Sequence, residues 1–163
     1  MATTAKKCTT TKKTITAPKP TVKKQSFKEV LAMLKEKYDE VYHDGGVYSV
    51  KLNGKWGFAD ANGAIKIKPC FTGIGEEWVE DIITTWGTGG IGFVNKKLEE
   101  IAKPQFSRSL PFNNGITAVM QKGGKWGLMD KKGKMITPFV FDNLDRSNGK
   151  YEVRIGSFTF VSK

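Results

Sequence analysis

The sequence has few of the residues that enzymes use for nucleophilic or metal chemistry. Its 163 residues include one histidine, His43, and two cysteines, Cys8 and Cys70. A Ser-His-Asp or Cys-His device needs a histidine held beside its nucleophile, and residues 42–46 (Tyr-His-Asp-Gly-Gly) have the composition of an exposed turn. A zinc site needs about four Cys or His ligands. We therefore expect a protein that is not an enzyme, with no catalytic residue, no metal and no cofactor.

Other chemical motifs are incomplete. Neighbouring carboxylates occur at residues 76–77, 80–81 and 99–100, but adjacent acids on a strand or loop point to opposite sides, which favours solvated roles. The Asp60–Gly63 segment begins like a calcium loop and lacks the later glutamate, so it predicts a β-turn. The glycine-rich segment 87–92 precedes no predicted helix that could help to bind phosphate.

Long apolar runs are also missing. No stretch of 18 or more apolar residues is present, so we expect no membrane span. The N-terminus has no apolar core behind its charges, which is unlike a secretory signal. Two cysteines cannot form a disulfide framework, and an intracellular, most simply cytoplasmic, protein is therefore expected.

Acidic residues are absent from residues 1–28, which carry eight lysines. They supply +8 of the net charge of +11, and the remaining chain is nearly balanced, with 19 basic and 16 acidic side chains. Residues 1–25 have little apolar content, which predicts a flexible basic tail. Eight positive charges without a negative one favour contact with a polyanion such as RNA or DNA. The expected polyanion-binding residues are Lys6, Lys7, Lys12, Lys13, Lys19, Lys23 and Lys24. A merely solubilising leader is the alternative.

A short helix is predicted over residues 27–37. Ser26 and Glu29 have the spacing of a capping box. Phe27, Val30, Leu31 and Leu34 share one face at helical spacing. Because terminal repeats leave an open hydrophobic end, we expect this amphipathic helix to cap the domain that follows.

Residues 38–163 repeat with a period of about 35. Asn53-Gly54-Lys55-Trp56-Gly57 recurs as Gly123-Gly124-Lys125-Trp126-Gly127, with Ile91 halfway between the two tryptophans. A second marker has the same period, at Phe71, Phe106 and Phe141. Two markers with one period indicate an array of similar units.

Strand and turn signals recur inside each unit. β-Branched runs alternate with the hairpin dipeptides Asn53-Gly54 and Gly123-Gly124, which tolerate positive φ. A proline follows each third run, and we expect it to end that strand. The glycine after each tryptophan is expected to allow a close approach of an indole or a neighbouring backbone.

These Lys-Trp-Gly segments, with the trailing Asp-x-x-Gly and the Pro-x-Phe closers, resemble the WG-repeat (KWG) family over about residues 38–163. The resemblance implies a β-rich interaction scaffold without assigned chemistry. The middle copy departs from the motif, because Ile91 replaces tryptophan. The predicted fold is mostly β, with three to four antiparallel three-stranded repeats. The predicted parts are a tail at 1–25, a capping helix at 26–37 and a repeat domain at 38–163.

Two tryptophans, Trp78 and Trp86, are out of phase with the repeat, and we expect them to be exposed partner-binding residues. The first functional hypothesis is a non-catalytic protein whose β-repeats dock on a protein partner while the tail contacts nucleic acid or another polyanion, as in an accessory subunit of a large assembly. The alternative is a pure protein–protein interaction module with no nucleic-acid role.

Overall fold

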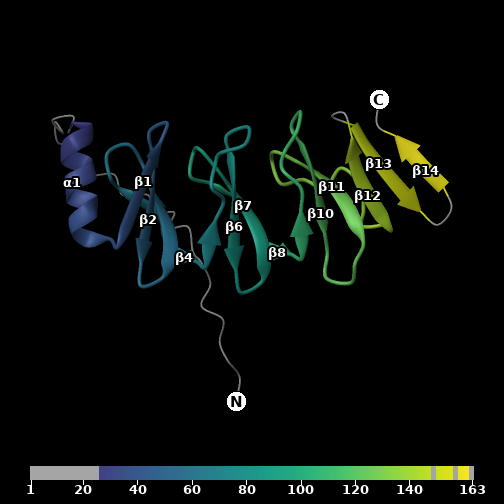
Figure 1. The fold of residues 1–163 in the computed structure, drawn as a ribbon, viewed down its shortest axis with the longest axis horizontal. Helices are drawn as coiled ribbons and strands as arrows, with labels where there is room; N and C mark the ends of the chain where they lie inside the picture. The colour runs from purple at the N-terminus through teal and green to yellow at the C-terminus, as the bar shows by residue number, and fades with distance from the viewer. Residues whose placement is uncertain (1–25, 148–149, 156–157, 162–163) are drawn as a thin grey trace, which may run out of the picture. The chain divides into compact units, whose positions relative to one another are not determined.

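The computed structural model describes residues 26–147, 150–155 and 158–161, and among them it has one helix and fourteen strands (Figure 1). They divide into two compact units. The first contains the chain up to Gly73 together with Lys97–Glu99, and the second contains Ile74–Lys96 and the chain from Glu100 onward. The predicted fold class, mostly β and antiparallel after one helix, is confirmed.

Helix α1 spans Phe27–Lys37, as predicted, and its capping box is formed. The Ser26 hydroxyl accepts from the Glu29 amide at 3.4 Å, while the Glu29 carboxylate accepts from the Ser26 amide at 2.8 Å. The bond from the Ser26 backbone holds the pKa of Glu29 below its ordinary value. Val30 and Leu34 are buried against the first sheet, whereas Phe27, assigned to the same apolar face, is 50% exposed.

The first unit has one sheet whose strands follow chain order, β1-β2-β3-β4. The strands are β1 (Glu40–Asp44), β2 (Val47–Leu52), β3 (Lys55–Ala59) and β4 (Ile65–Phe71). Gly45-Gly46 and Asn53-Gly54 join the first three with positive φ at both turn residues, as two-residue hairpins require. The sheet has four strands rather than three because β1 adds to the three runs that the sequence indicates.

The second unit contains three further sheets, apart from Gly73 at the start of the first of them, and each is again built from strands that are neighbours in the chain. The first consists of β5 (Gly73–Ile74), β6 (Ile82–Gly87), β7 (Gly90–Asn95) and β8 (Glu100–Phe106). The second consists of β9 (Arg108–Ser109), β10 (Ile116–Met120) and β11 (Trp126–Asp130). The third consists of β12 (Asn143–Ser147), β13 (Lys150–Ile155) and β14 (Phe158–Val161).

The prolines do not end their strands as expected. Pro69 lies within β4 and Pro104 within β8. The pairing of each strand with its neighbour shifts register close to the proline, so the chain bulges where proline cannot donate a hydrogen bond and pairing resumes at Phe71 and Phe106. In the next copy residues 134–136 make no strand, and Met135 forms only an isolated bridge to Met129.

A glycine faces this bulge in the first two copies of the repeat, Gly57 after Trp56 and Gly92 after Ile91. A Cβ added at Gly57 would lie 2.5 Å from the Ile67 carbonyl oxygen, and one at Gly92 would lie 2.6 Å from that of Ala102. Neither distance is possible for a real side chain. At Gly57 the predicted role, a close approach of neighbouring backbone, is therefore confirmed, whereas the atom nearest to a Cβ at Gly127 would be the Met135 side-chain Cε at 2.8 Å.

The repeat markers have unequal roles in the core. Phe71, Phe106 and Phe141 are all buried. Trp126 is buried with Phe141 in one hydrophobic cluster, but Trp56 is only half-buried. The phenylalanine at this period is therefore the more constant core residue.

Candidate docking groove

The seven predicted polyanion-binding lysines lie outside the described residues. They are Lys6, Lys7, Lys12, Lys13, Lys19, Lys23 and Lys24. The two predicted partner-binding tryptophans are described, and the structure gives them different surroundings.

Trp86 lies in β6 and is 40% exposed. Its partner in the β6–β7 ladder is Ile91. At the same place in the first unit, Lys51 pairs with Trp56. The tryptophan missing from the middle repeat is thus present on the opposite strand of the same hairpin, where the sequence period does not reveal it.

Trp86 lines an open groove of about 650 Å³ in the second unit. Buried Ile82 and Phe112 contribute apolar surface to it, while Trp86 and Pro111 are exposed along it. Its ionisable lining residues are Glu76 and Glu77, both exposed, and none of the described lining residues is basic. The groove therefore combines an aromatic and proline surface with two negative charges.

The loop that carries the two glutamates is held by a tight hairpin. Val79 and Ile82 exchange backbone hydrogen bonds of 2.8 and 3.0 Å, and the turn residues Glu80 and Asp81 have φ of 50° and 66°. Both φ values are positive, as in a type I′ turn, although neither residue is a glycine. The loop is therefore fixed at its end in a conformation that costs free energy.

Glu80 connects this hairpin to the next one. Its carboxylate accepts from the Gly115 amide at 2.9 Å and forms an ion pair with Lys131 at 3.0 Å. Burial raises the pKa of Glu80, but hydrogen bonds from Lys131 and from the amides of Gly115 and Asn114 outweigh it and hold that pKa below its ordinary value. The charged carboxylate thus helps to position the groove.

Trp78 is half-buried and does not line the groove. The ammonium of Lys96 lies 5.8 Å from the centre of its ring, within the range of a cation–π contact. Lys96 also lies 3.8 Å from Asp81. Trp78 thus contacts side chains of its own unit, and only Trp86 of the predicted pair borders the groove.

The sequence did not single out Pro111 and Phe112. They follow β9 and belong to the next repeat, so their meeting with Trp86 depends on how two sheets pack. The sequence did contain one signal for them, the Leu-Pro-Phe run at residues 110–112. A proline next to an aromatic residue outside the repeat period does not fit the strand pattern.

A second groove of about 390 Å³ lies near β8. Its lining includes Glu100 and Lys103, so its charge is mixed. Burial raises the pKa of Glu100 above its ordinary value, although Lys103 opposes that effect. Without an exposed large aromatic side chain among its described lining residues, this groove offers a weaker anchor than the first.

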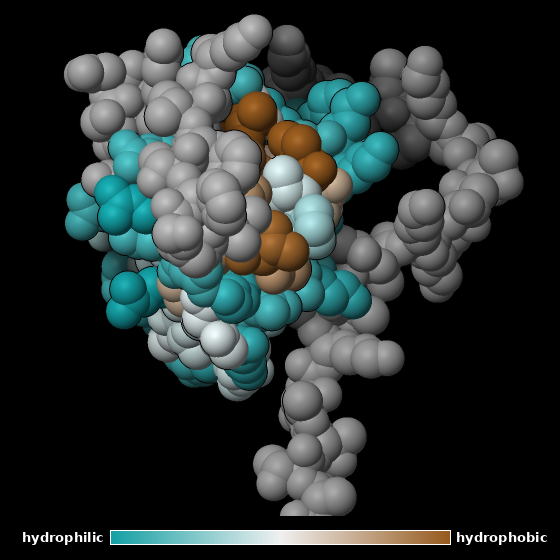
Figure 2. Space-filling model, turned by 90° about the vertical axis from the view of Figure 1, so that its right-hand side faces the viewer, coloured by the Kyte–Doolittle hydropathy of each residue, from teal (hydrophilic) through white to brown (hydrophobic). Residues whose placement is uncertain are grey.

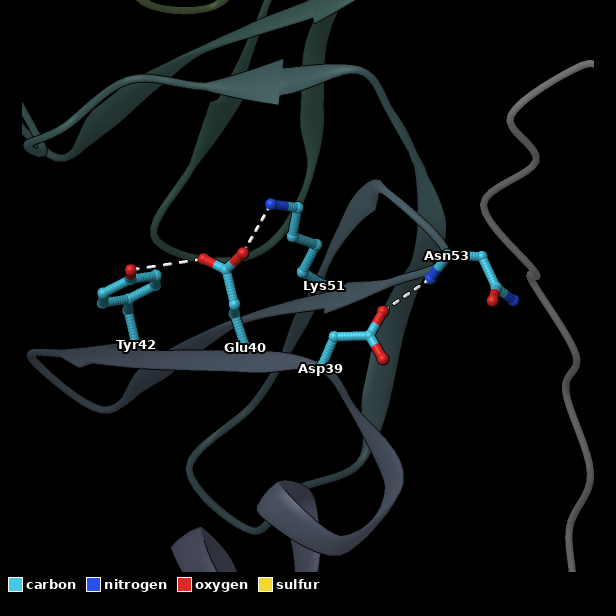
Figure 3. Close-up of polar contacts among 5 residues, drawn as sticks. All are labelled: Asp39, Glu40, Tyr42, Lys51 and Asn53. Carbon is cyan, nitrogen blue, oxygen red and sulfur yellow. Dashed lines mark hydrogen bonds and ion pairs between the residues drawn. The ribbon is translucent and has the colours of Figure 1, made fainter.

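Polar contacts in the first unit hold a hairpin together (Figure 3). Glu40 accepts hydrogen bonds from Lys51 at 2.5 Å and from the Tyr42 hydroxyl at 3.3 Å. The bond from Lys51 lowers the pKa of Glu40. Asp39 accepts from the Asn53 amide at 2.8 Å, which ties the β2–β3 turn to the strand before it.

His43 lies in β1, not in the turn that the sequence indicated. Its ring is 4.7 Å from the rings of both Phe27 and Tyr48, and its Nε2 accepts from the Gly46 amide at 3.3 Å. These contacts join the helix, β1 and the first hairpin turn. The histidine is thus used in packing.

In residues 26–147, 150–155 and 158–161, no three His, Cys, Asp or Glu side chains are grouped to hold a metal ion. No helix in the same ranges is both long enough and apolar enough to cross a membrane. Cys70, half-buried in β4, is disulfide-bonded, which the cysteine count did not lead us to expect.

Hydrophobic residues gather on one face of the surface. Figure 2 shows such a group amid hydrophilic residues on the face that it presents. Large apolar side chains exposed among the described residues are Phe27, Tyr42, Trp86, Ile136 and Val140. Trp86 is the one of these five that borders either of the two grooves.

The family named WG containing repeat matches residues 91–126 and 126–157. The two matches begin at Ile91 and Trp126, the residues that mark the 35-residue period, so the resemblance seen in the sequence is confirmed over residues 91–157. No curated protein matches the sequence.

Two solved structures are similar at a low level. The computationally designed Ika4 protein has a TM-score of 0.39 and 10% identity, over 75% of this chain and 88% of that one. BamB from Moraxella catarrhalis has a TM-score of 0.38 and 11% identity, over 74% of this chain and 42% of that one.

Proposed function

We propose that this chain, whose residues 91–157 match the family named WG containing repeat, is a non-catalytic binding protein. In this proposal the groove beside Trp86 docks a protein segment, and the lysines of residues 1–25 contact nucleic acid or another polyanion. Such a pair of contacts would suit an accessory subunit of a large assembly. The observation that carries the docking role is the 40% exposure of Trp86 beside the groove.

An exposed tryptophan at the edge of an apolar groove has the character of a binding hot spot. Tryptophan supplies a large apolar face and is enriched among the residues that dominate interface energy. The hydrophobic cluster below it, which includes Ile82, Phe93 and Phe112, gives the groove a packed base. A base of this kind keeps its shape when a ligand binds, which lowers the entropic cost of binding.

The polyanion role is supported by charge alone. Residues 1–28 carry eight lysines and no acid, and neutralised phosphates release counterions when such a segment binds. Affinity then falls steeply with salt. On a single strand, the slope of log affinity against log salt concentration becomes about 0.7 more negative for each phosphate neutralised.

The experiment is a salt titration of the binding of a labelled thymidine oligonucleotide, followed by fluorescence anisotropy. Serine replacements of Lys6, Lys7, Lys12 and Lys13 should weaken binding and lower the salt slope by about 3. A matched variant replaces four exposed lysines of the folded part, Lys35, Lys68, Lys103 and Lys122. An equal loss in the matched variant would contradict the special role of the tail.

The second candidate function is a pure protein-interaction module, which the exposed Trp86 alone would support. In that case the oligonucleotide would bind weakly and both lysine variants would behave like the parent chain, whereas Trp86→Ala would abolish partner capture. Nuclease treatment would leave capture unchanged.

A further inference from the structure

We propose that the groove beside Trp86 binds a basic segment of a partner protein, and that a lysine or arginine of this segment lies between the Trp86 ring and the carboxylates of Glu76 and Glu77. The proposal rests on the proposed function and deepens it, because it names the chemistry of the docked segment. All three side chains belong to the second unit.

The first unit shows how this type of repeat holds a cation. The Lys51 ammonium donates to the Glu40 carboxylate at 2.5 Å and lies 5.2 Å from the centre of the Trp56 ring. The hydrogen bond to Glu40 raises the pKa of Lys51, which favours the charged ammonium. One carboxylate and one indole thus share a single ammonium on that sheet, which combines an ion pair with a cation–π contact.

The equivalent place in the second unit has a tryptophan and carboxylates but no lysine. Trp86 occupies the ladder position that Lys51 has in the first unit, and it pairs with Ile91. Glu76 and Glu77 are exposed in the same groove as Trp86, and none of the described lining residues is basic. A basic side chain that completes the arrangement therefore comes from a binding partner.

Apolar surface beside these charges favours a peptide over a small free cation. Buried Ile82 and Phe112 contribute apolar surface to the groove, and exposed Trp86 and Pro111 border it. Its volume of about 650 Å³ exceeds what one ammonium group can fill. A segment with an apolar residue close to its basic residue contacts the charged and the apolar surface at once.

Charge also distinguishes between classes of partner. Glu76 and Glu77 repel the phosphates of a nucleic acid, and such like-charge contacts suppress wrong partners. The same carboxylates attract a basic protein segment, orient it and speed its association. The groove and the lysines proposed to bind polyanions therefore serve different partners.

The test passes a degenerate library of synthetic octapeptides over the immobilised full chain at about 0.15 M salt, and the bound peptides are sequenced. Lysine and arginine should be enriched about threefold or more over the input, with an apolar residue within two positions. Glu76→Gln with Glu77→Gln should abolish the enrichment of basic residues and keep that of apolar ones, because only the carboxylates change. Trp86→Ala should abolish both.

A matched control removes two exposed carboxylates that lie outside the groove, Glu36→Gln with Glu99→Gln. This variant has the same net charge as the double groove variant and should select the same peptides as the parent chain. Equal enrichment of basic and acidic residues by the parent chain would overturn the proposal. So would an unchanged selection by the double groove variant.

NMR of the full chain with ¹⁵N-labelled tryptophan locates the bound peptide. Trp86→Phe assigns the indole N–H signal of Trp86, which should move when an enriched peptide is added, while the Trp56 signal should stay in place. Glutamine in place of the basic residue of the peptide should weaken binding about tenfold. A peptide that moves the Trp56 signal and leaves the Trp86 signal constant would overturn the proposed site.

The two proposals fail separately in these experiments. Selected peptides that lack basic residues and still move the Trp86 signal would retain a groove that docks a protein segment and would reject the basic occupant. A Trp86→Ala chain that selects the same peptides as the parent would reject the groove itself as the docking site.

Discussion

Trp86 stands directly opposite Ile91 in the β6–β7 ladder, whereas the corresponding pair of the first unit is Lys51 opposite Trp56. Both hairpins therefore hold one tryptophan at this pair, but on opposite strands. In the first unit the Lys51 ammonium lies 5.2 Å from the Trp56 ring centre. In the second unit no lysine occupies the pair, and the tryptophan borders the groove.

Exchanging the pair tests this equivalence. Trp86→Lys alone should destabilise the fold by about 1–2 kcal/mol, because apolar contact area is lost. Adding Ile91→Trp should return the free energy of unfolding to within about 1 kcal/mol of the parent, since it recreates a Lys–Trp cross-strand pair. Urea denaturation measures both. A double variant no more stable than Trp86→Lys would show that the two hairpins differ in more than this pair.

Thr85→Val should stabilise the second unit by about 1 kcal/mol. The Thr85 hydroxyl is buried and has no hydrogen-bond partner, so its removal relieves an unsatisfied polar group. Val50 lies three residues before the first unit's hairpin turn at Asn53, as Thr85 lies three residues before the turn at Thr88, and Val50 is also fully buried. Thr117→Val is the matched control, because the Thr117 hydroxyl donates to the Leu110 carbonyl at 2.5 Å. The control should lose about 1 kcal/mol in thermal or urea unfolding, and equal losses in both variants would contradict the prediction.

Gly92→Ala should destabilise by about 3 kcal/mol. Its added Cβ would lie 2.6 Å from the Ala102 oxygen and equally close to the Pro104 nitrogen, and backbone cannot move aside cheaply. Gly75→Ala is the control, because its Cβ would have an ordinary contact of 3.5 Å with Ile83. Stability of the control should change by about 0.5 kcal/mol or less. Urea midpoints that fall equally for both would argue against the close approach at the bulge.

Glu100→Gln should stabilise the protein at neutral pH. Burial raises the pKa of Glu100 in the folded state, so the folded chain binds this proton more tightly than the unfolded chain. Its charge therefore costs stability above the folded pKa, and the cost disappears as pH falls below the unfolded value. The gain from glutamine should accordingly be present at neutral pH and absent in acid. Unfolding curves at both pH values measure it, with Glu36→Gln as an exposed control; a gain independent of pH would point to another cause.

The fold could be predicted from the sequence because the signals that determine it act over short stretches of the chain. The capping box of Ser26 and Glu29 and the hairpin dipeptide Asn53-Gly54 act over a few residues, and the phenylalanine period marks the core. The prediction that proline ends each third strand was wrong, although proline usually does so. Here the strand bulges at Pro69, and pairing resumes at Phe71. The bulge needs a glycine at position 57 on the neighbouring strand, because a Cβ there would lie 2.6 Å from the Pro69 nitrogen.

The groove could be predicted only in part. Trp86 stood out because it does not fit the repeat period, and Glu76 and Glu77 stood out because they lie in the longest insertion of a single repeat. Their meeting with Pro111 and Phe112 depends on packing between sheets. The turn at Glu80 and Asp81 was also hidden, because it contains no glycine and glutamate rarely adopts positive φ.

Every described sheet pairs only strands that follow one another in the chain. Such pairing closes short loops, and proteins with mostly local pairing fold fast for their size. During synthesis, each sheet can pair as soon as its own last strand has left the ribosome, without waiting for distant sequence. Growth of such a chain by duplication of one unit therefore adds a complete sheet and leaves the pairing of the earlier ones intact.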